Sequence, residues 1–241
     1  MTAGSAAASR GARKIWLMFI VATVFGAVLV GPYLLLGSDN SRLDVNGGVH
    51  YALLVTHIFT ALIALVLGPL QFVPAIRTRR QIHRTIGRLY LFAGVLPSAL
   101  AAVPVALLSG RLITQIGLTI PAVLWLITGT LAYQAARRHD YTQHQNWMMR
   151  NYALTFLAVT SRILVPLLLL AQTPFITSAG SIGDRAPSMI PIGQSLGWIV
   201  NLIAAETLIR RRRPRSARSR RDVRPSPSGG SARPEDEECG V

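Results

Sequence analysis

The sequence predicts an all-α membrane protein, a polytopic bundle of six transmembrane helices followed by a basic tail. Its 241 residues are 51% hydrophobic with a mean hydropathy of +0.40, yet their formal net charge is +15. This combination is unusual for a soluble domain. Six apolar runs, each near the ~20 residues needed to cross the hydrocarbon core of a bilayer, are separated by short basic connections.

The apolar runs follow one another through most of the chain. The first begins at Ile15, directly after a cytoplasmic tail over residues 1–14. It exceeds the apolar core of a signal peptide and lacks a small-x-small cleavage site, so we expect an uncleaved span. The transmembrane domain covers residues 15–210, with a core over 50–170. Its six predicted spans are residues 15–36, 52–74, 86–109, 113–135, 146–171 and 190–209.

The basic residues predict the orientation of these spans. The alternating connections place twenty-one Lys and Arg residues on one side and only Arg42, Arg111 and Arg185 on the other. Cytoplasmic connections of membrane proteins carry the excess of positive charge. Both termini are therefore expected in the cytoplasm. The bilayer then accounts for the basic composition, and we expect no nucleic-acid partner.

Residues 211–241 predict a disordered cytoplasmic tail, because Pro, Ser, Gly and Arg dominate it and hydrophobic residues nearly vanish. Its arginines act either as a topology signal or as a site for anionic lipid head groups, worth ~1 kcal/mol per basic residue near the surface. The single cysteine, Cys239, lies in this tail. Neither a disulfide framework nor a cysteine metal site is predicted.

The fifth predicted span carries a line of polar side chains along what we expect to be one uninterrupted helix. Hydrocarbon offers such side chains no partners, so this face is expected to turn toward protein or a wet cavity. The residues recur at steps of three and four, the spacing of one helical face, and are His144, Met148, Asn151, Thr155, Ala158 and Arg162.

A second stripe, of small and polar residues, follows the second span. Small residues on one face allow another helix to approach closely, so we expect spans two and five to pack together. A rise of ~1.5 Å per residue places His57 and Arg162 at a similar outer depth, which is compatible with a shared outer site. The stripe consists of His57, Ala61, Ala64, Gly68 and Gln71.

Histidines open both the third span, with HRTIGRLY from His83, and the fifth, with HQNWMMRNY from His144. Two histidines at matching depth on separate helices are the minimum for axial ligation of haem b. Gly87, one turn after His83, leaves room for a flat group beside the ring. The open alternative is that both histidines are caps at the membrane interface.

Charged and aromatic residues around these histidines have expected roles as well. Arg84, Arg88 and Arg150 would hold the acidic groups of a cofactor or lipid. Glu206, the only acid inside a predicted span, is expected to pair with one of these three arginines. Tyr90 and Trp147 are expected to anchor the helices at the interface.

The segments THIFTALIALVLGPLQF, HRTIGRLY and HQNWMMRNYALTFLAVTSR together resemble a bacterial family of multi-pass membrane proteins, known only as domain-of-unknown-function family 2306. The resemblance covers roughly residues 50–170. It implies a multi-pass protein of the bacterial cytoplasmic (inner) membrane and supports the candidate residues. The matching positions are His57, Gly68 to Phe72, His83 to Tyr90, and His144 to Arg150.

Three functional interpretations remain open. The first is a b-type haem or quinone-linked redox protein, with His83 and His144 as ligands and His57 with Arg162 at the outer end. The second is a cofactor-free transporter or lipid- or solute-binding protein, whose cavity the same residues line. The third is that the polar stripes only hold helices together. No soluble-type catalytic motif is present, and whether the protein is an enzyme does not follow from the sequence.

Overall fold

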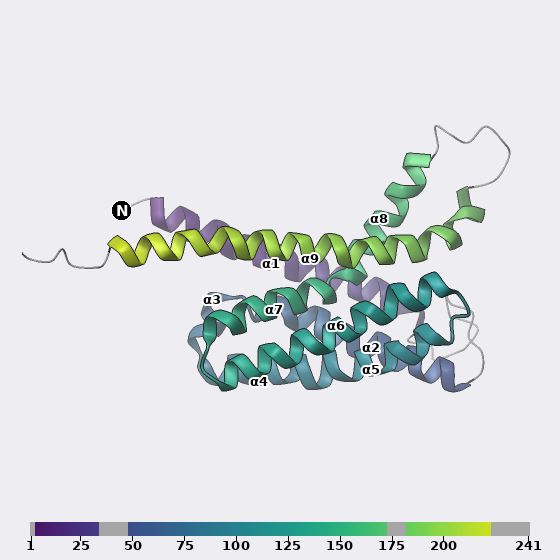
Figure 1. Cartoon of the computed structure of the whole chain (residues 1–241), viewed down its shortest axis with the longest axis horizontal. Coiled ribbons are helices and arrows are strands. Elements are labelled where there is room, and N and C mark those ends of the chain that lie inside the picture. Colours follow the sequence, from purple (N-terminus) through teal and green to yellow (C-terminus); the bar gives the residue numbers. More distant parts are fainter. Residues whose placement is uncertain (1–2, 34–47, 173–181, 223–241) are drawn as a thin grey trace, which may run out of the picture. The chain divides into compact units, whose positions relative to one another are not determined.

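The computed structural model describes residues 3–33, 48–172 and 182–222, and every regular element in these ranges is helical (Figure 1). The predicted all-α class is confirmed. The α-helices are α1 (Ala3–Val30), α2 (Gly48–Leu70), α3 (Pro74–Thr78), α4 (Arg80–Arg88), α5 (Leu96–Leu107), α6 (Leu112–Arg137), α7 (Tyr141–Thr155), α8 (Leu157–Gln172) and α9 (Ile182–Asp222).

Several helices are long and apolar enough to cross a bilayer. A bent pair, α7 with α8, adds one more span if it is counted as a single crossing, and the apolar part of α1, Ile15–Val30, is shorter than the others. A multi-pass arrangement is therefore supported with four or five candidate spans, and the predicted number of six is not confirmed. The four long stretches are Gly48–Leu70, Arg80–Leu107, Leu112–Arg137 and Ser188–Arg212.

The helices begin earlier than the apolar runs suggested. Helix α4 already starts at Arg80, and α7 starts at Tyr141. The carboxylate of Asp140 caps α7 by accepting a hydrogen bond from the backbone N–H of Gln143 at 3.0 Å, as N-cap side chains do. An apolar run marks the part of a helix that lipid covers, whereas caps and turns set its ends. His83 and His144 therefore lie inside helices, each within the first turn.

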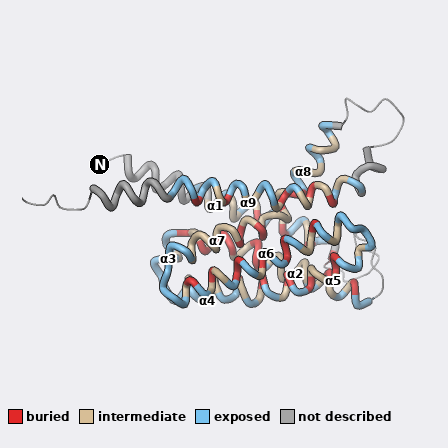
Figure 2. The backbone as a smooth tube through the Cα atoms, in the orientation of Figure 1, coloured by how far each residue is buried: buried red, intermediate tan, exposed pale blue. Residues whose placement is uncertain are grey.

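Helices α2, α5, α6 and α7 form the packed centre of the fold. Helix α2 packs against α5, α5 against α6, and α6 against α7; the four run alongside one another in Figure 1. Buried positions gather on the faces that these helices turn toward each other, and exposed positions follow the outer faces (Figure 2). Apolar residues on the outer faces are expected for helices surrounded by lipid.

The stripe on α2 packs against two neighbours. A Cβ atom built on Gly94 would lie 2.9 Å from the backbone nitrogen of Ala64, so α2 and the third span touch almost backbone to backbone. One turn further along α2, Gly68 faces the ring of Tyr152 on α7. The predicted contact between spans two and five is thus present at Gly68, while Ala64 and His57 contact the third span instead.

The third span widens into a π-helical turn over Leu89–Val95, just before Pro97 in the first turn of α5. Proline has no N–H to donate and crowds the preceding turn, and an extra residue per turn accommodates it. Tyr90 lies in this widened turn and is fully buried. The prediction that Tyr90 is an interface anchor is therefore wrong, because the ring points into the bundle.

The fifth span is broken at Phe156, where α7 and α8 meet at an angle of 46°. Asn201 of α9 inserts at the break: its Nδ2 donates to the Ala153 carbonyl at 3.0 Å, and its Oδ1 accepts from Thr160 Oγ1 at 2.8 Å. A side chain inserted into the helical hydrogen-bond ladder is an established cause of bending. The expectation of one uninterrupted helix is therefore wrong.

Helix α9 uses small residues to approach α8. A Cβ atom on Gly193 would meet Val165, and one on Gly197 would meet Leu157 and Ser161, as in small-xxx-small helix contacts. The helix continues to Asp222, into the segment for which the sequence predicted disorder. Residues 223–241 lie outside the described residues. The chain divides into two compact units after Glu206.

We predict that Gly94→Ala lowers the free energy of unfolding by about 1–3 kcal/mol, the usual effect of overpacking. The added methyl group would press on the Ala64 backbone, which cannot move aside as a flexible side chain does. Thermal unfolding in detergent micelles measures the effect. Gly48→Ala is the matched control, because no described residue lies within 4 Å of its added atom; equal stability of the two variants would contradict the close crossing.

Candidate functional site

Two cavities adjoin where the end of α2 meets α4 and α7. One has a volume of about 390 Å³ and the other of about 340 Å³, within the ~300–1,000 Å³ typical of small-molecule sites. We call them together the histidine cleft. The side chains that line both cavities are Gln71, Arg80, His83, Tyr141, His144 and Met148.

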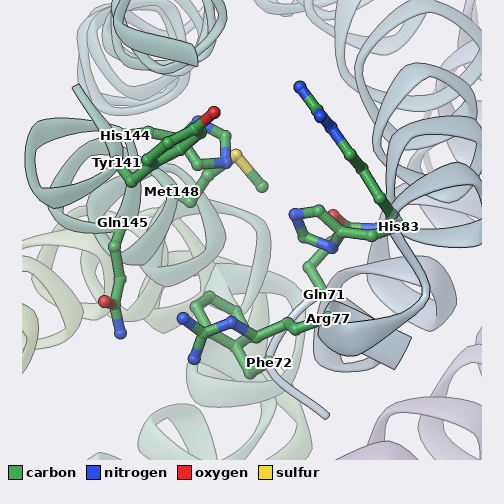
Figure 3. A pocket seen from close by; sticks show the side chains of 9 residues that line it. Gln71, Phe72, Arg77, His83, Tyr141, His144, Gln145 and Met148 are labelled. Atoms are coloured by element: carbon green, nitrogen blue, oxygen red, sulfur yellow. The ribbon is translucent and has the colours of Figure 1, made fainter. Parts of the chain in front are cut away.

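His83 and His144 face each other across the histidine cleft. Their ring centroids are 6.3 Å apart and the ring planes are nearly perpendicular, at 86°. Figure 3 shows the two rings directed toward one another from opposite sides, with the thioether of Met148 beside His144. Each histidine is brought there by the first turn of its own helix. The structure therefore joins the two residues that the sequence paired by depth alone.

The two rings differ in what holds them. His144 Nδ1 lies 2.8 Å from the Ala132 carbonyl of α6, and because a carbonyl only accepts, this nitrogen carries the proton. In the neutral tautomer with the proton on Nδ1, the lone pair of the ring is on Nε2. His83 Nδ1 is buried and, among the described residues, has no hydrogen-bond partner. One ring is thus fixed by the protein, and the other has a polar atom left unsatisfied.

Gln71 carries a second unsatisfied group in the same cleft. The residue is 5% exposed, and no described residue accepts a hydrogen bond from its Nε2. Its amide lies against Gly87, where a Cβ atom would come within 3.2 Å of Oε1. The room that the sequence predicted beside Gly87 is therefore taken by this amide. A buried donor costs about 1–3 kcal/mol when nothing accepts its hydrogen bond, so water or a bound group in the cleft would stabilise this amide.

Arginines surround the cleft without counter-ions. Among the residues described, no acidic side chain lines either cavity, and none of these arginines forms an ion pair. The local electrostatic potential is therefore strongly positive. The predicted Arg84 and Arg88 are members of this group. The full set is Arg77 and Arg80 in the larger cavity, and Arg80, Arg84, Arg88 and Arg137 in the smaller one.

Arg150, the third arginine predicted to hold acidic groups, lies outside the cleft. Its Nη2 donates to Glu206 Oε2 at 2.7 Å, and its Nε donates to the same oxygen at 3.2 Å. The guanidinium also lies 4.7 Å from the centre of the Trp147 ring. The expected ion pair of Glu206 is therefore present and joins α7 to α9.

His57 and Arg162 lie away from the cleft as well. His57 Nδ1 is 2.9 Å from the Ser98 carbonyl, and Ser98 Oγ donates back to the His57 carbonyl at 3.1 Å. This reciprocal pair joins α2 to α5. Arg162 is exposed on α8, where its Nη1 donates to the Ala158 carbonyl at 2.9 Å. The interior position that the sequence predicted for Arg162 is therefore not confirmed.

A buried polar network centred on Asn151 lies deeper in the bundle. Tyr90 Oη donates to Asn151 Oδ1 at 2.6 Å, and Asn151 Nδ2 donates to the Trp125 carbonyl at 2.7 Å and to Thr128 Oγ1 at 2.9 Å. Thr155 Oγ1 lies 2.9 Å from Tyr90 Oη and accepts from Trp125 Nε1 at 3.0 Å. The interior face predicted for the fifth span is thus confirmed at Met148, Asn151 and Thr155.

Sequence reasoning missed several residues of the cleft. The sequence contained a pattern that could have identified Gln71, since this residue ends the polar stripe on the second span. Arg77 and Arg80 belonged to a recognised basic connection. Arg137 belonged to the next basic connection, between the fourth and fifth spans. Tyr141 had no signal, because it reaches the cleft through the sharp connection between α6 and α7, where His139 has a φ of 61°. The described residues contain no group of three or more His, Cys, Asp or Glu side chains that could hold a metal ion.

We predict that Asn151→Leu lowers the free energy of unfolding by about 1–3 kcal/mol, because it removes the buried hydrogen bonds of Asn151 with Tyr90, Thr128 and the Trp125 carbonyl. Thermal unfolding of purified protein measures the loss. Asn146→Leu on the same helix is the control, since Asn146 is only partly buried. Equal effects of the two substitutions would mean that the network does not stabilise the bundle.

These features define a polytopic α-helical membrane protein with a histidine- and arginine-lined cleft. Residues 54–209 match the family described as "Predicted membrane protein (DUF2306)". The match covers more than half of the chain, so the protein belongs to this family, and the resemblance found in the sequence is confirmed. No curated protein and no solved structure matches the chain.

Proposed function

We propose that the histidine cleft binds one b-type haem between His83 and His144, and that the protein is a membrane redox protein. The observation that carries the proposal is the pair of rings facing each other at 6.3 Å between centroids. Metal–nitrogen bonds of histidine are about 2 Å long, so two histidines flanking one metal have ring centres about 6 Å apart. The spacing of His83 and His144 fits this requirement.

The surroundings of the two rings support the same assignment. Metal-bound histidines usually donate their other ring N–H to a carbonyl or carboxylate, which orients the ring; the Ala132 carbonyl does this for His144. Arg84 and Arg88 are placed to hold carboxylate groups at the rim of the cleft. When bound, haem supplies one-electron chemistry, and the protein sets its ligands and polarity.

The proposal includes a topology and a location. We assign six spans with both termini in the cytoplasm of a bacterium, and the inner membrane as the site. The connections that carry the cleft arginines belong to the side with the excess of positive charge, so the cleft would open toward the cytoplasm. A quinone as the electron partner and anionic lipids at the basic tail stay predictions.

A second candidate is a cofactor-free transporter or solute-binding protein that uses the same cleft. The break at Phe156 is the observation behind this candidate, since discontinuous helices are typical of transporter binding sites, but Phe156 lines neither cavity of the cleft. The two candidates differ in one visible property, because only the haem protein is coloured.

We predict that protein purified in mild detergent, after expression with haem available, shows a stoichiometric b-type signal in an oxidised-minus-dithionite-reduced spectrum. His83→Ala and His144→Ala should each abolish or strongly reduce this signal, because each removes one axial ligand. His139→Ala is the control, since His139 is exposed and lines only the smaller cavity; it should retain the signal. A folded, monodisperse and colourless wild-type preparation would reject the haem function and leave the second candidate.

A further inference from the structure

The histidine cleft contains several hydrogen-bond donors that have no acceptor among the described residues; the amide of Gln71 is buried, and the arginines are exposed. Gln71 Nε2 is buried, has no partner among the described residues, and belongs to a side chain that lines both cavities. Arg80 is the one arginine shared by the two cavities. The larger cavity adds Arg77, and the smaller adds Arg84. All of these groups donate hydrogen bonds, and none accepts one through its nitrogen.

The sequence explains why this donor set is stable without a protein acceptor. The backbone N–H of Gln71 donates to the Gly68 carbonyl at 3.1 Å in the turn that ends α2, and the side chain of Gln71 packs on Gly87. Gly87 leaves the space for the amide, since any larger residue would push it away. Arg80 and Arg84 are exposed at one turn's spacing on α4, so water solvates them while the cleft is open.

We propose that Gln71 and Arg80 form an oxyanion-binding site, which takes a carboxylate or phosphate group. Such a group is acceptor-only, so it satisfies the unpartnered amide and the guanidinium at once. Haem propionates, lipid phosphates and free phosphate all carry this chemistry. The inference shares the cleft with the proposed haem site but does not require haem, because the donors are present whichever molecule brings the oxyanion.

The full-length protein tests this with three probes. The first is inorganic phosphate in detergent, and the second is a nanodisc of phosphatidylcholine with or without phosphatidylglycerol, both read as shifts in unfolding temperature. A ligand that binds only the folded state raises this temperature, by an amount that grows with the logarithm of its concentration divided by its Kd. The third probe compares haem with haem dimethyl ester, whose propionates are blocked, by titration of the Soret band. These probes separate a free anion, a lipid phosphate and a propionate as the source.

We expect at least one oxyanion probe to bind wild-type protein and to bind about ten-fold more weakly to Gln71→Leu and Arg80→Gln. Arg138→Gln is the matched control, because Arg138 is exposed at the end of α6 and lines neither cavity; it should change affinity less than two-fold, about the limit for a distant surface charge. If the Gln71→Leu variant does not fold, because Gln71 is buried, the Arg80→Gln variant alone tests the inference.

Two results would overturn the inference. One is that no binding depends on an oxyanion. This would be seen either as no binding of any probe, or as equal binding of haem and its dimethyl ester with no effect of phosphate or phosphatidylglycerol. The other is that Arg138→Gln weakens binding as much as Arg80→Gln, which would indicate only a general positive surface. Loss of the haem signal is a separate readout, so a colourless protein that phosphatidylglycerol stabilises would end the haem proposal and keep the oxyanion site.

Discussion

Hydrocarbon cannot hydrogen-bond to a protein, and this constraint organises the whole bundle. Polar side chains on the membrane helices must therefore find one another, and they do so around Asn151. Its amide connects Tyr90 of the third span with Trp125 and Thr128 of α6, so one residue of α7 fixes two neighbouring helices. The same constraint accounts for the reciprocal pair of His57 and Ser98, which joins α2 to α5 at a different depth.

The histidine cleft depends on this network for its shape. His144 lies two helical turns before Asn151 on α7, and His83 lies two turns before Tyr90 in the third span. Because Tyr90 and Asn151 are joined by a 2.6 Å hydrogen bond, the two helices are held at a set distance just below the histidines. Close packing of Gly94 on Ala64 and of Gly68 on Tyr152 fixes the third partner, α2. Gln71 at the end of α2 then reaches the same cleft as both rings.

Much of this arrangement follows from spacing along the chain, and the rest does not. The polar face of the fifth span and the pairing of His83 with His144 are predictable, since helical periodicity and depth are read directly from sequence. The break at Phe156 is not, because its cause is Asn201, a residue 45 positions later on another helix. Arg150 shows the same limit: its motif placed it near His144, but Glu206 on α9 determines where its guanidinium lies.

The bundle therefore contains two kinds of polar region, and their contrast bears on function. Around Asn151 the donors and acceptors are matched, which is what structural polar contacts between membrane helices achieve. In the histidine cleft, Gln71 Nε2 and His83 Nδ1 are buried without partners in the described part of the chain, and the surrounding arginines have no counter-ion there. The cleft lies only two helical turns from the Asn151 network, where the polar groups are matched. Leaving Gln71 Nε2 and His83 Nδ1 unsatisfied lowers the stability of the folded protein. Ser109 Oγ, Thr119 Oγ1 and Trp198 Nε1 are also buried without partners among the described residues. The cleft differs from these positions because its two unsatisfied groups lie together with arginines along the same cavities, where one bound molecule could reach all of them.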